Sequence, residues 1–438
     1  MNIDTLVCSR WIIPVEPDGL VLENHALAFN NGKIVDILPN ETAEKTYHAE
    51  NVVHLINHAL IPGLVNAHTH SPMTLLRGIA DDLPLMEWLQ ETIWPLEQKW
   101  ISEAFVRDGT DFAIAEMLRG GITCFNDMYF FPEISSRRAL LAGIRANIGL
   151  IVIDFPSAWA QTSDDYLRKG VALHDELRGK SLVTTSFAPH APYSVSDSAL
   201  QKIQVYAEEL ELSVHMHVHE TRDEIEQSLK DYGMRPLQRL HKLGLLAPSF
   251  IGVHMTQLNE EEIQLVAECG AHIVHCPESN LKLASGFCPV HQLLQHDINV
   301  ALGTDSAASN NNLDMVGEMR TAALLAKGVS NDAKAVPAAA ALRMATLAGA
   351  KALGLDANIG SLQIGKSADV TAIDLNILET LPSYNPISQI VYAANRDQVT
   401  DVWVAGRRLL QSRKLTTLDR ESLKHTIVQW AEKLASTS

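Results

Sequence analysis

Two histidines separated by one residue, His68 and His70, end an apolar segment that begins at Leu64. Side chains alternate between the two faces of a strand, so residues 68 and 70 project to the same side and can bind one ion. Such a pair is a weak signal when taken alone, because most histidines have structural or surface roles. A metal site here therefore needs ligands from other parts of the chain.

Further candidate ligands lie at or just beyond the ends of three later strand-like segments: His217, His254 and Asp305. His217 lies in an alternating run, residues 215–219, whose three histidines share one face of a strand, so at most one or two of them can be ligands. Glu220 lies three residues beyond His217, where a loop can bring its carboxylate over the metal, and this favours His217. We assign His215 and His219 to packing or to hydrogen bonds behind the ligands.

The candidate ligands form a set of nitrogen and oxygen donors, with two histidines from one strand, a third histidine and one aspartate. This set suits Zn²⁺, with Fe²⁺ and Mn²⁺ as alternatives. A catalytic metal keeps one coordination position for water. The pattern therefore predicts a catalytic metal centre.

The segments that position these residues alternate between strand-like and helical patterns. Helical patterns at residues 107–119, 198–210 and 260–269 lie between eight strand-like segments, at residues 64–68, 122–126, 146–153, 182–187, 213–217, 251–254, 272–275 and 299–302. This alternation predicts an α/β fold, a parallel (β/α)8 barrel, with a doubly wound open sheet as the alternative. In a barrel the active site lies at the carboxyl ends of the strands, which is where the candidate ligands fall.

Both ends of the chain carry short strand-like segments, at residues 26–29, 34–37, 368–373 and 402–404. Neither end is long enough to bury a core of its own, so we expect them to meet in one small β-sandwich. The predicted domains are this sandwich, residues 1–58 and 362–438, and a metal-dependent barrel hydrolase domain, residues 59–361. Asp419 is expected to cap a last helix, whose apolar stripe comprises Leu423, Ile427, Trp430 and Leu434.

Composition narrows the class of partner and the compartment. The 438 residues carry a formal net charge of −17, which disfavours binding to a phosphate backbone and hence a nucleic-acid partner. The five cysteines are widely spread and include no C-x-x-C pair, which argues against a disulfide framework and favours a reducing compartment such as the cytoplasm. We find no signal peptide and no apolar run of about 18 residues, so no membrane span is expected.

The segment Pro62-Gly-Leu-Val-Asn-Ala-His-Thr-His70 resembles the first-strand signature of the amidohydrolase superfamily. The resemblance covers the full chain, and within the superfamily it is closest to the 5′-methylthioadenosine/S-adenosylhomocysteine deaminases. Four further segments carry this narrower resemblance, at residues 88–97, 189–193, 279–283 and 302–310.

The resemblance implies one zinc ion per subunit, held by His68, His70, His217 and Asp305, without a lysine carbamate. It also implies that Glu220 and His254 flank the reacting carbon, and that Glu97 and His190 touch the substrate. The implied substrate is a small purine nucleoside. Members of this family often pair, so a homo-oligomer is an open alternative.

These residues suggest a mechanism for hydrolytic deamination of an adenine ring. Asp305 would take a proton from water, a protonated Glu220 would donate to ring N1, and His254 would orient the attacking oxygen. Glu97 would accept both ribose hydroxyls, and Trp88 would pack on the nucleoside. Without the resemblance, Glu97 fits a solvated helix residue and Trp88 a core residue.

Two features bear on the 5′ substituent of the nucleoside. Residues 146–152 contain no arginine, whereas related proteins often place one in this region to meet the distal end of the substrate. Glu278 is expected to put an acidic side chain near the mouth of the site. Both features favour a methylthio or an unsubstituted nucleoside over a homocysteine carboxylate.

Other functions compete for the same residues. A triazine chlorohydrolase would use the same metal and water, and deaminases of guanine, pterin or cytosine differ only in loop-borne ring contacts. A free base lacks a ribose, which would leave Glu97 without a partner. A catalytically inactive scaffold of this fold is the alternative from another class, and it is disfavoured because all four candidate metal ligands and Glu220 are present.

Overall fold

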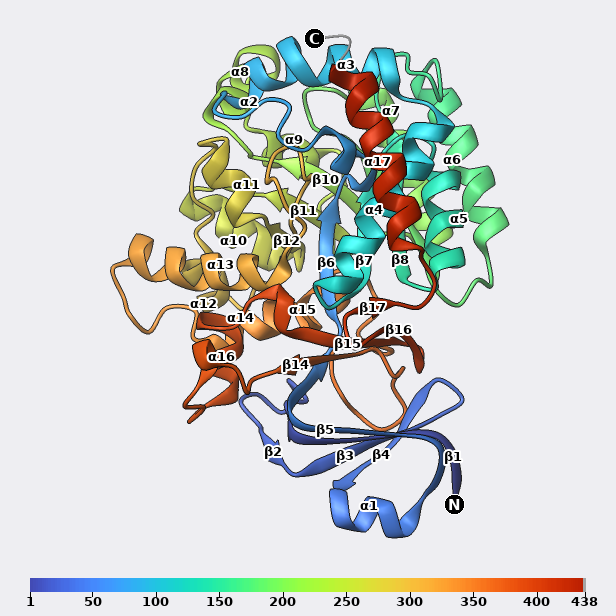
Figure 1. Ribbon diagram of the computed structural model, residues 1–438. Coiled ribbons are helices and arrows are strands. Elements are labelled where there is room, and N and C mark those ends of the chain that lie inside the picture. Colours follow the sequence, from blue (N-terminus) through green and yellow to red (C-terminus); the bar gives the residue numbers. More distant parts are fainter. Residues whose placement is uncertain (436–438) are drawn as a thin grey trace.

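The computed structural model describes residues 1–435 and contains a nearly closed barrel and a separate mixed sheet (Figure 1). Eight parallel strands form the barrel, and neighbours in the barrel are also neighbours in the sequence. They are β6 (Leu64–Thr69), β7 (Ile122–Met128), β8 (Arg145–Val152), β9 (Val183–Pro189), β10 (Val214–Val218), β11 (Phe250–His254), β12 (His272–His275) and β13 (Val300–Leu302). The predicted barrel is confirmed. The open-sheet alternative is wrong, because a doubly wound sheet reverses its strand order part-way across.

The first and last barrel strands meet through the residues that follow β13. The Asp305 amide donates to the carbonyl of His68 at 3.0 Å, and the Thr304 amide donates to the side chain of Asn66 at 2.9 Å. A side chain at Gly303 would lie 2.8 Å from the Cβ atom of His68, so only glycine allows this approach. The closing seam of the barrel therefore runs directly beside two candidate metal ligands.

Helices between the strands surround the barrel, and several begin at a residue whose side chain caps them. Ser102, Thr162, Thr221 and Asn259 each accept a hydrogen bond from the backbone amide three residues later. The helices that follow these caps are α4 (Glu103–Arg119), α6 (Ser163–Leu177), α8 (Arg222–Tyr232) and α10 (Glu260–Cys269). The others of the barrel include α5 (Pro132–Ala142), α7 (Asp197–Leu210), α9 (Pro236–Lys242), α11 (Pro277–Lys282), α12 (Val290–Gln295) and α13 (Met315–Ser330).

A long excursion separates β6 from α4. It comprises a 3₁₀ helix η1 (Ser71–Leu76), a short turn α2 (Leu85–Glu87), a π-helical turn η2 (Trp88–Ile93) and α3 (Trp94–Trp100). The buried residues of this excursion form their own apolar cluster together with Phe105 and Tyr129. This cluster fixes the excursion beside the carboxyl ends of the strands.

Both chain ends build the second sheet, as predicted, and it has nine strands. The central strand β5 (His48–Pro62) pairs parallel with β1 (Asn2–Ile12) and antiparallel with β14 (Val370–Asp374). The remaining strands are β2 (Leu22–Glu23), β3 (His25–Asn30), β4 (Lys33–Pro39), β15 (Val399–Val404), β16 (Arg407–Gln411) and β17 (Lys414–Leu415). Phe29 and Trp403 pack edge to face at 6.3 Å in a core shared by the two halves of the sheet. The two layers of the expected sandwich are thus halves of one continuous sheet.

The last helix, α17 (Arg420–Ala435), lies against α4 of the barrel (Figure 1). Trp430 packs edge to face against Trp100 and Phe105, and its indole nitrogen donates to Asp108 at 2.9 Å. Trp430 and Leu434 are buried, whereas Leu423 and Ile427 are only partly covered. The predicted boundaries assign this helix to the sandwich, but its packing partner is the barrel. The domain boundaries themselves stay a prediction.

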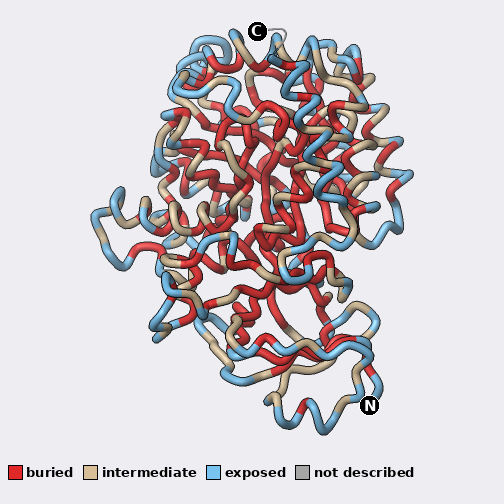
Figure 2. The backbone as a smooth tube through the Cα atoms, viewed as in Figure 1, coloured by how far each residue is buried: buried red, intermediate tan, exposed pale blue. Residues whose placement is uncertain are grey.

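Buried residues are concentrated in the barrel and in the centre of the second sheet (Figure 2). No helix within residues 1–435 is long and apolar enough to cross a membrane.

A buried ion pair joins the barrel and the second sheet: Arg145 at the start of β8 donates to both carboxylate oxygens of Asp369, at 3.0 and 3.2 Å. Asp369 also accepts from the Ala405 amide at 2.8 Å. The barrel and the second sheet are therefore held together by a polar contact as well as by apolar packing.

Arg145→Ala should leave the Asp369 carboxylate buried without its cation. Removing one partner of a buried ion pair costs about 3–5 kcal/mol, so we expect a clearly lower melting temperature by calorimetry. Arg222→Ala is the control, because its ion pair with Glu226 is solvent-exposed; that variant should lose less than about 1 kcal/mol. Equal melting temperatures for the two variants would contradict a structural role for the buried pair.

Candidate active site

Four side chains converge at the carboxyl end of the barrel: His68, His70, His217 and Asp305. The His217 Nε2 atom lies 3.1 Å from His68 Nε2 and 3.3 Å from His70 Nε2. Asp305 Oδ1 lies 3.3 Å from both His68 Nε2 and His70 Nε2. The structure therefore brings together all four predicted ligands around one point.

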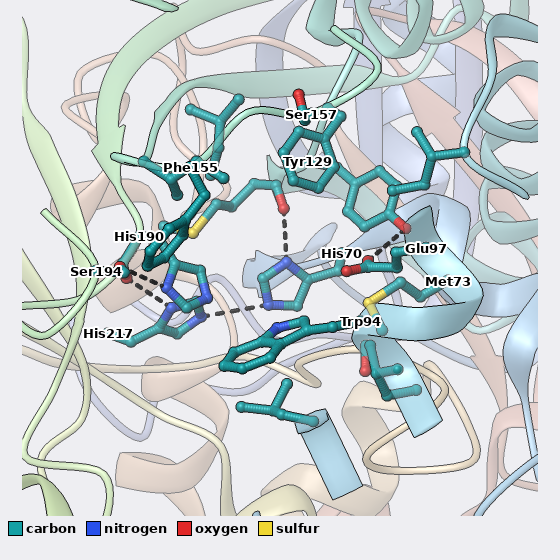
Figure 3. Close-up of a pocket in the computed structure, with 18 of the residues that line it drawn as sticks. His70, Met73, Trp94, Glu97, Tyr129, Phe155, Ser157, His190, Ser194 and His217 are labelled. Carbon is teal, nitrogen blue, oxygen red and sulfur yellow. Dashed lines mark hydrogen bonds between the residues drawn. The ribbon is translucent and has the colours of Figure 1, made fainter. Parts of the chain in front are cut away.

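Hydrogen bonds on the far sides of the rings decide where their protons lie. His70 Nδ1 donates to the carbonyl of Met128 at 2.6 Å, and His217 Nδ1 donates to the carbonyl of His190 at 2.8 Å. In its neutral form each ring then carries a lone pair on Nε2, and the two Nε2 atoms face each other (Figure 3). Two facing lone pairs repel each other unless a cation lies between them.

The spacing of these atoms also fits a metal ion. Bonds of 2.0–2.1 Å in a tetrahedral site place neighbouring ligand atoms about 3.3 Å apart, which is close to the observed 3.1 to 3.3 Å. Three nitrogens and one carboxylate oxygen are also a donor set that zinc accepts. The histidine cluster can therefore hold a metal ion.

Burial sets the charge of these groups. It lowers the pKa of His68 to about 4 and that of His217 well below its usual range, so both rings are neutral, as metal binding requires. Burial acts to raise the pKa of Asp305, but the adjacent His68 and His70 rings outweigh it and hold that pKa well below its usual value. The carboxylate is therefore ionised.

A second layer of polar groups fixes the orientation of the four side chains. Ser279 and Ser309 donate to Asp305 Oδ2 at 2.7 and 2.9 Å. His215 Nε2 lies 3.1 Å from His68 Nδ1, which is the supporting role expected for it. His219 faces away, towards Glu262, because its backbone has a φ of 56° and leaves the strand alternation. No pattern in the sequence assigned these roles to Ser279 and Ser309.

Glu220 and His254 lie next to each other beside this cluster. Glu220 Oε2 is 3.7 Å from His254 Nε2, and both side chains are buried. Burial raises the pKa of Glu220, which favours its protonated form. Asn280 accepts from His254 Nδ1 at 2.8 Å and orients the ring. The two groups that are expected to flank the reacting carbon are thus on one side of the cluster.

Glu224 holds the backbone that presents Glu220. Its two carboxylate oxygens accept from the amides of His219 and Glu220 at 3.0 and 2.8 Å. Thr256 donates to the Glu220 carbonyl at 2.7 Å. The loop after β10 is therefore fixed on both sides, and the Glu220 side chain does not depend on loop mobility for its position.

A cavity of about 590 Å³ opens above these groups. His70, His217, Glu220, His254 and Asp305 form its polar end, and His190, Tyr193 and Ser194 also line it. The remaining wall is mostly apolar and aromatic and includes Met73, Trp94, Tyr129 and Phe155 (Figure 3). Trp88 also lines it. No lysine or arginine within residues 1–435 lines this cavity. It therefore combines a polar end with apolar walls that carry no positive charge.

The residues that were predicted to touch a substrate lie in this cavity. Glu97 lines it and accepts from the Tyr129 hydroxyl at 2.7 Å, so it is not a solvated helix residue. Burial raises the pKa of Glu97 to about 7 against the opposing effect of Tyr129. Trp88 is both a wall of the cavity and part of an apolar cluster. His190 Nδ1 forms a hydrogen bond of 2.9 Å with the Ser194 hydroxyl.

One sequence expectation for the mouth of the site is wrong. The Glu278 carboxylate does not line the cavity; it accepts from Thr321 at 3.0 Å and from Asn312 at 3.1 Å. Helix α11 directs residue 278 towards α13, while its next two residues face Asp305 and His254. The aromatic residues Trp94, Tyr129 and Phe155 were missed, because they come from separate segments, the start of α3 and the residues after β7 and β8, without a shared pattern.

A model of the amidohydrolase family matches residues 59–409. The chain belongs to the amidohydrolase family. Over 435 residues this amidohydrolase is 50% identical to a 5-methylthioadenosine/S-adenosylhomocysteine deaminase of Teredinibacter turnerae, with 99% of this chain and 98% of the relative covered. It is also 36% identical over 427 residues to a 5′-deoxyadenosine deaminase of Methanopyrus kandleri, with 97% and 98% covered.

The structure of this chain matches a crystal structure of a zinc-bound adenosine deaminase from Xanthomonas campestris with a TM-score of 0.98. The two sequences are 51% identical, and the match covers 99% of each chain. The family resemblance and the class of enzyme, a hydrolytic deaminase, are thereby confirmed.

His217→Ala should abolish tight metal binding by this amidohydrolase. We expect about one equivalent of zinc in the dialysed wild-type protein and a small fraction of that in the variant, measured by elemental analysis. Because binding stabilises the folded state, chelation should also lower the wild-type melting temperature. His241→Ala, at an exposed histidine on α9, is the control and should keep its metal. Full zinc content in His217→Ala would refute the assignment.

Proposed function

We propose that this protein is a zinc-dependent hydrolase that deaminates the adenine ring of a small purine nucleoside, giving the inosine analogue and ammonia. One observation carries the proposal: the convergent ligands with Glu220 and His254 occupy one end of a cavity whose wall carries Glu97. A heterocycle at the polar end would place its attached sugar towards Glu97. The names of the relatives, 5-methylthioadenosine/S-adenosylhomocysteine deaminase and 5′-deoxyadenosine deaminase, agree with such a substrate.

The proposed metal is zinc, and the donor set would also accept Fe²⁺ or Mn²⁺. His68, His70, His217 and Asp305 would hold it. When bound, it supplies Lewis acidity that lowers the pKa of water to roughly 7. The Asp305 carboxylate, which Ser279 and Ser309 keep in place, takes one proton from the attacking water.

Glu220 acts as the acid for the ring. In its protonated form it donates to N1 of the adenine, which makes C6 electrophilic, and a proton then passes to the amino group so that ammonia leaves. His254 orients the oxygen that adds to C6 through Nε2, which accepts a hydrogen bond in the neutral ring because Nδ1 donates to Asn280. Water thus supplies the new oxygen on C6, and the C6–N bond is the one that breaks.

Glu97 binds the ribose in this proposal. One of its carboxylate oxygens already accepts from Tyr129, and the carboxylate retains lone pairs for ribose hydroxyls. A free base such as guanine, a pterin or cytosine would leave Glu97 without a partner, so a nucleoside is favoured. His190 lies near His217 and would contact the ring or the ribose.

The apolar wall selects the 5′ substituent. A homocysteine group brings a carboxylate, and no cationic side chain of the described residues lines the cavity to balance it. A methylthio group or a 5′-deoxy carbon needs no such partner. We therefore rank 5′-methylthioadenosine and 5′-deoxyadenosine above S-adenosylhomocysteine.

The cytoplasm is the proposed compartment. All five cysteines are free, which agrees with a reducing environment.

A nucleoside panel tests the proposal. The zinc-loaded protein should deaminate 5′-methylthioadenosine and 5′-deoxyadenosine with a kcat/KM at least about tenfold above that for S-adenosylhomocysteine, measured by loss of adenine absorbance and by ammonia release. Glu220→Gln should lower kcat by roughly 10²–10⁴ while it keeps its zinc. Turnover of guanine or a pterin alone, or full activity of Glu220→Gln, would refute the assignment.

Glu97→Gln should raise KM for nucleosides more than it lowers kcat. Above its pKa of about 7 Glu97 is a charged acceptor. Each lost hydrogen bond to it is then worth about 1.5–3 kcal/mol, so at pH about 8 KM should rise roughly 10-fold or more. Glu91→Gln is the control, because Glu91 is an exposed residue of the same excursion and lies outside the cavity. An unchanged KM in Glu97→Gln would exclude the ribose-binding role and leave the chemistry at Glu220 untouched.

A further inference from the structure

A second, smaller cavity of about 240 Å³ lies where α4, the second sheet and α17 meet. Six of its lining side chains are cationic: Arg77, Arg119, Arg396, Arg413, Arg420 and Lys424. Only two are anionic, Glu116 and Asp397. This excess of positive charge is concentrated in one concavity of a chain whose formal net charge is −17.

The two carboxylates do not neutralise the cluster. Glu116 is shared between Arg77 and Arg396, and its contact with Arg396 measures 2.7 Å. Asp397 pairs with Arg413 at 2.8 Å, but its own side chain is 79% exposed, so water screens this pair. Arg119 and Arg420 have no bond to a carboxylate among the described residues. Lys424 pairs with Glu421 at 3.5 Å, but both side chains are exposed, so water screens this pair.

The backbone contacts of this cluster keep its arginines close together. Arg413 donates to the carbonyls of Arg119, Arg396 and Val399 at 2.7 to 2.9 Å. Arg119 in turn donates to the Arg413 carbonyl at 2.8 Å. Burial and the nearby Arg420 and Arg396 lower the pKa of Arg119, which is the signature of like charges held together. The fold thus fixes guanidinium groups against their mutual repulsion.

One donor of the cluster also lacks a partner. Arg77 Nε is buried and makes no hydrogen bond, although its Nη2 atom is paired with Glu116. Arg420 is exposed, and no partner of its guanidinium is found within residues 1–435. Unpaired donors and uncompensated charge in a concavity together describe a site that lacks its counterion.

We propose that this cavity, the cationic cleft, binds a compact phosphate-bearing anion. Guanidinium groups match the oxygens of a phosphate bidentately, and several of them converging from different elements suit a tetrahedral dianion better than a planar carboxylate. The volume is below the usual range of about 300–1,000 Å³ for larger ligands, which favours an anion between orthophosphate and pyrophosphate in size. Phe112, Leu415, Leu423 and Ile427 give the cleft an apolar side that would shield these contacts from water.

The cationic cleft adjoins the end of η1, the helix that follows the candidate metal ligand His70. Arg77 ends the 3₁₀ helix η1, and the residue that precedes η1 is the candidate metal ligand His70. An anion here would tie together η1, α4 and α17, which pack against one another. The cleft and the large cavity have no lining residue in common, so anion binding can be measured apart from nucleoside turnover.

Titration calorimetry of the zinc-loaded protein with orthophosphate and with pyrophosphate tests the proposal. Both anions should bind, with affinity falling as salt rises. The double variant Arg420→Ala/Lys424→Ala should weaken binding at least about tenfold, because it removes two charges without touching the backbone contacts of Arg413. Arg222→Ala/Lys230→Ala, two exposed cations on α8, is the matched control and should bind like the wild type.

Binding at the metal must be told apart from binding in the cleft. His217→Ala, which lacks a candidate metal ligand, should bind the anions as the wild type does if the cleft is the site. Loss of binding in His217→Ala, or unchanged binding in Arg420→Ala/Lys424→Ala with an unaltered melting temperature, would overturn the proposal. Absence of binding by the wild type would overturn it as well, and none of these three results depends on deaminase activity.

Discussion

The site depends on the forced approach of three imidazole nitrogens and one carboxylate. The Nε2 atoms of His70 and His217 face each other because the Nδ1 atom of each ring donates to a backbone carbonyl on the other side. This arrangement is unfavourable without a cation, so the rest of the fold must hold it. The barrel does so at its seam, where the Asp305 amide bonds to the carbonyl of His68. Closing the barrel and assembling the ligand set are therefore one structural event.

Burial makes the supporting hydrogen bonds necessary. A polar group in a dry site costs free energy unless it is paired, and here each ligand has a fixed partner on its outer side. The backbone is also held in unusual conformations: His254 and Asp305 have φ angles of 73° and 60°. Non-glycine residues adopt the left-handed region only where the surroundings impose it. Near the site, this conformation occurs at His254 and Asp305 and also at His219 and Met255.

The distribution of charge separates two kinds of surface in one chain. The large cavity carries its ionisable groups at one end, has apolar walls and is lined by no lysine or arginine of the described residues. The cationic cleft gathers six positive side chains outside the barrel, around the end of the helix that starts beside His70. The excursion between β6 and α4 supplies part of the wall of the large cavity, including Trp94 and Glu97, and one residue that lines the cationic cleft, Arg77. The excursion therefore borders both the large cavity and the cationic cleft.

Local periodicity allowed the sequence by itself to determine much of this. The two-residue spacing of His68 and His70, the eight alternating segments and the strands at both ends are properties of consecutive residues, and they predicted the barrel, the composite sheet and the candidate ligands. The tertiary structure alone decided that Glu278 turns towards α13, that α17 packs on the barrel, and that Trp94, Tyr129 and Phe155 share one cavity. These outcomes depend on how distant loops and helices pack, and no repeat in the sequence encodes the path of a loop.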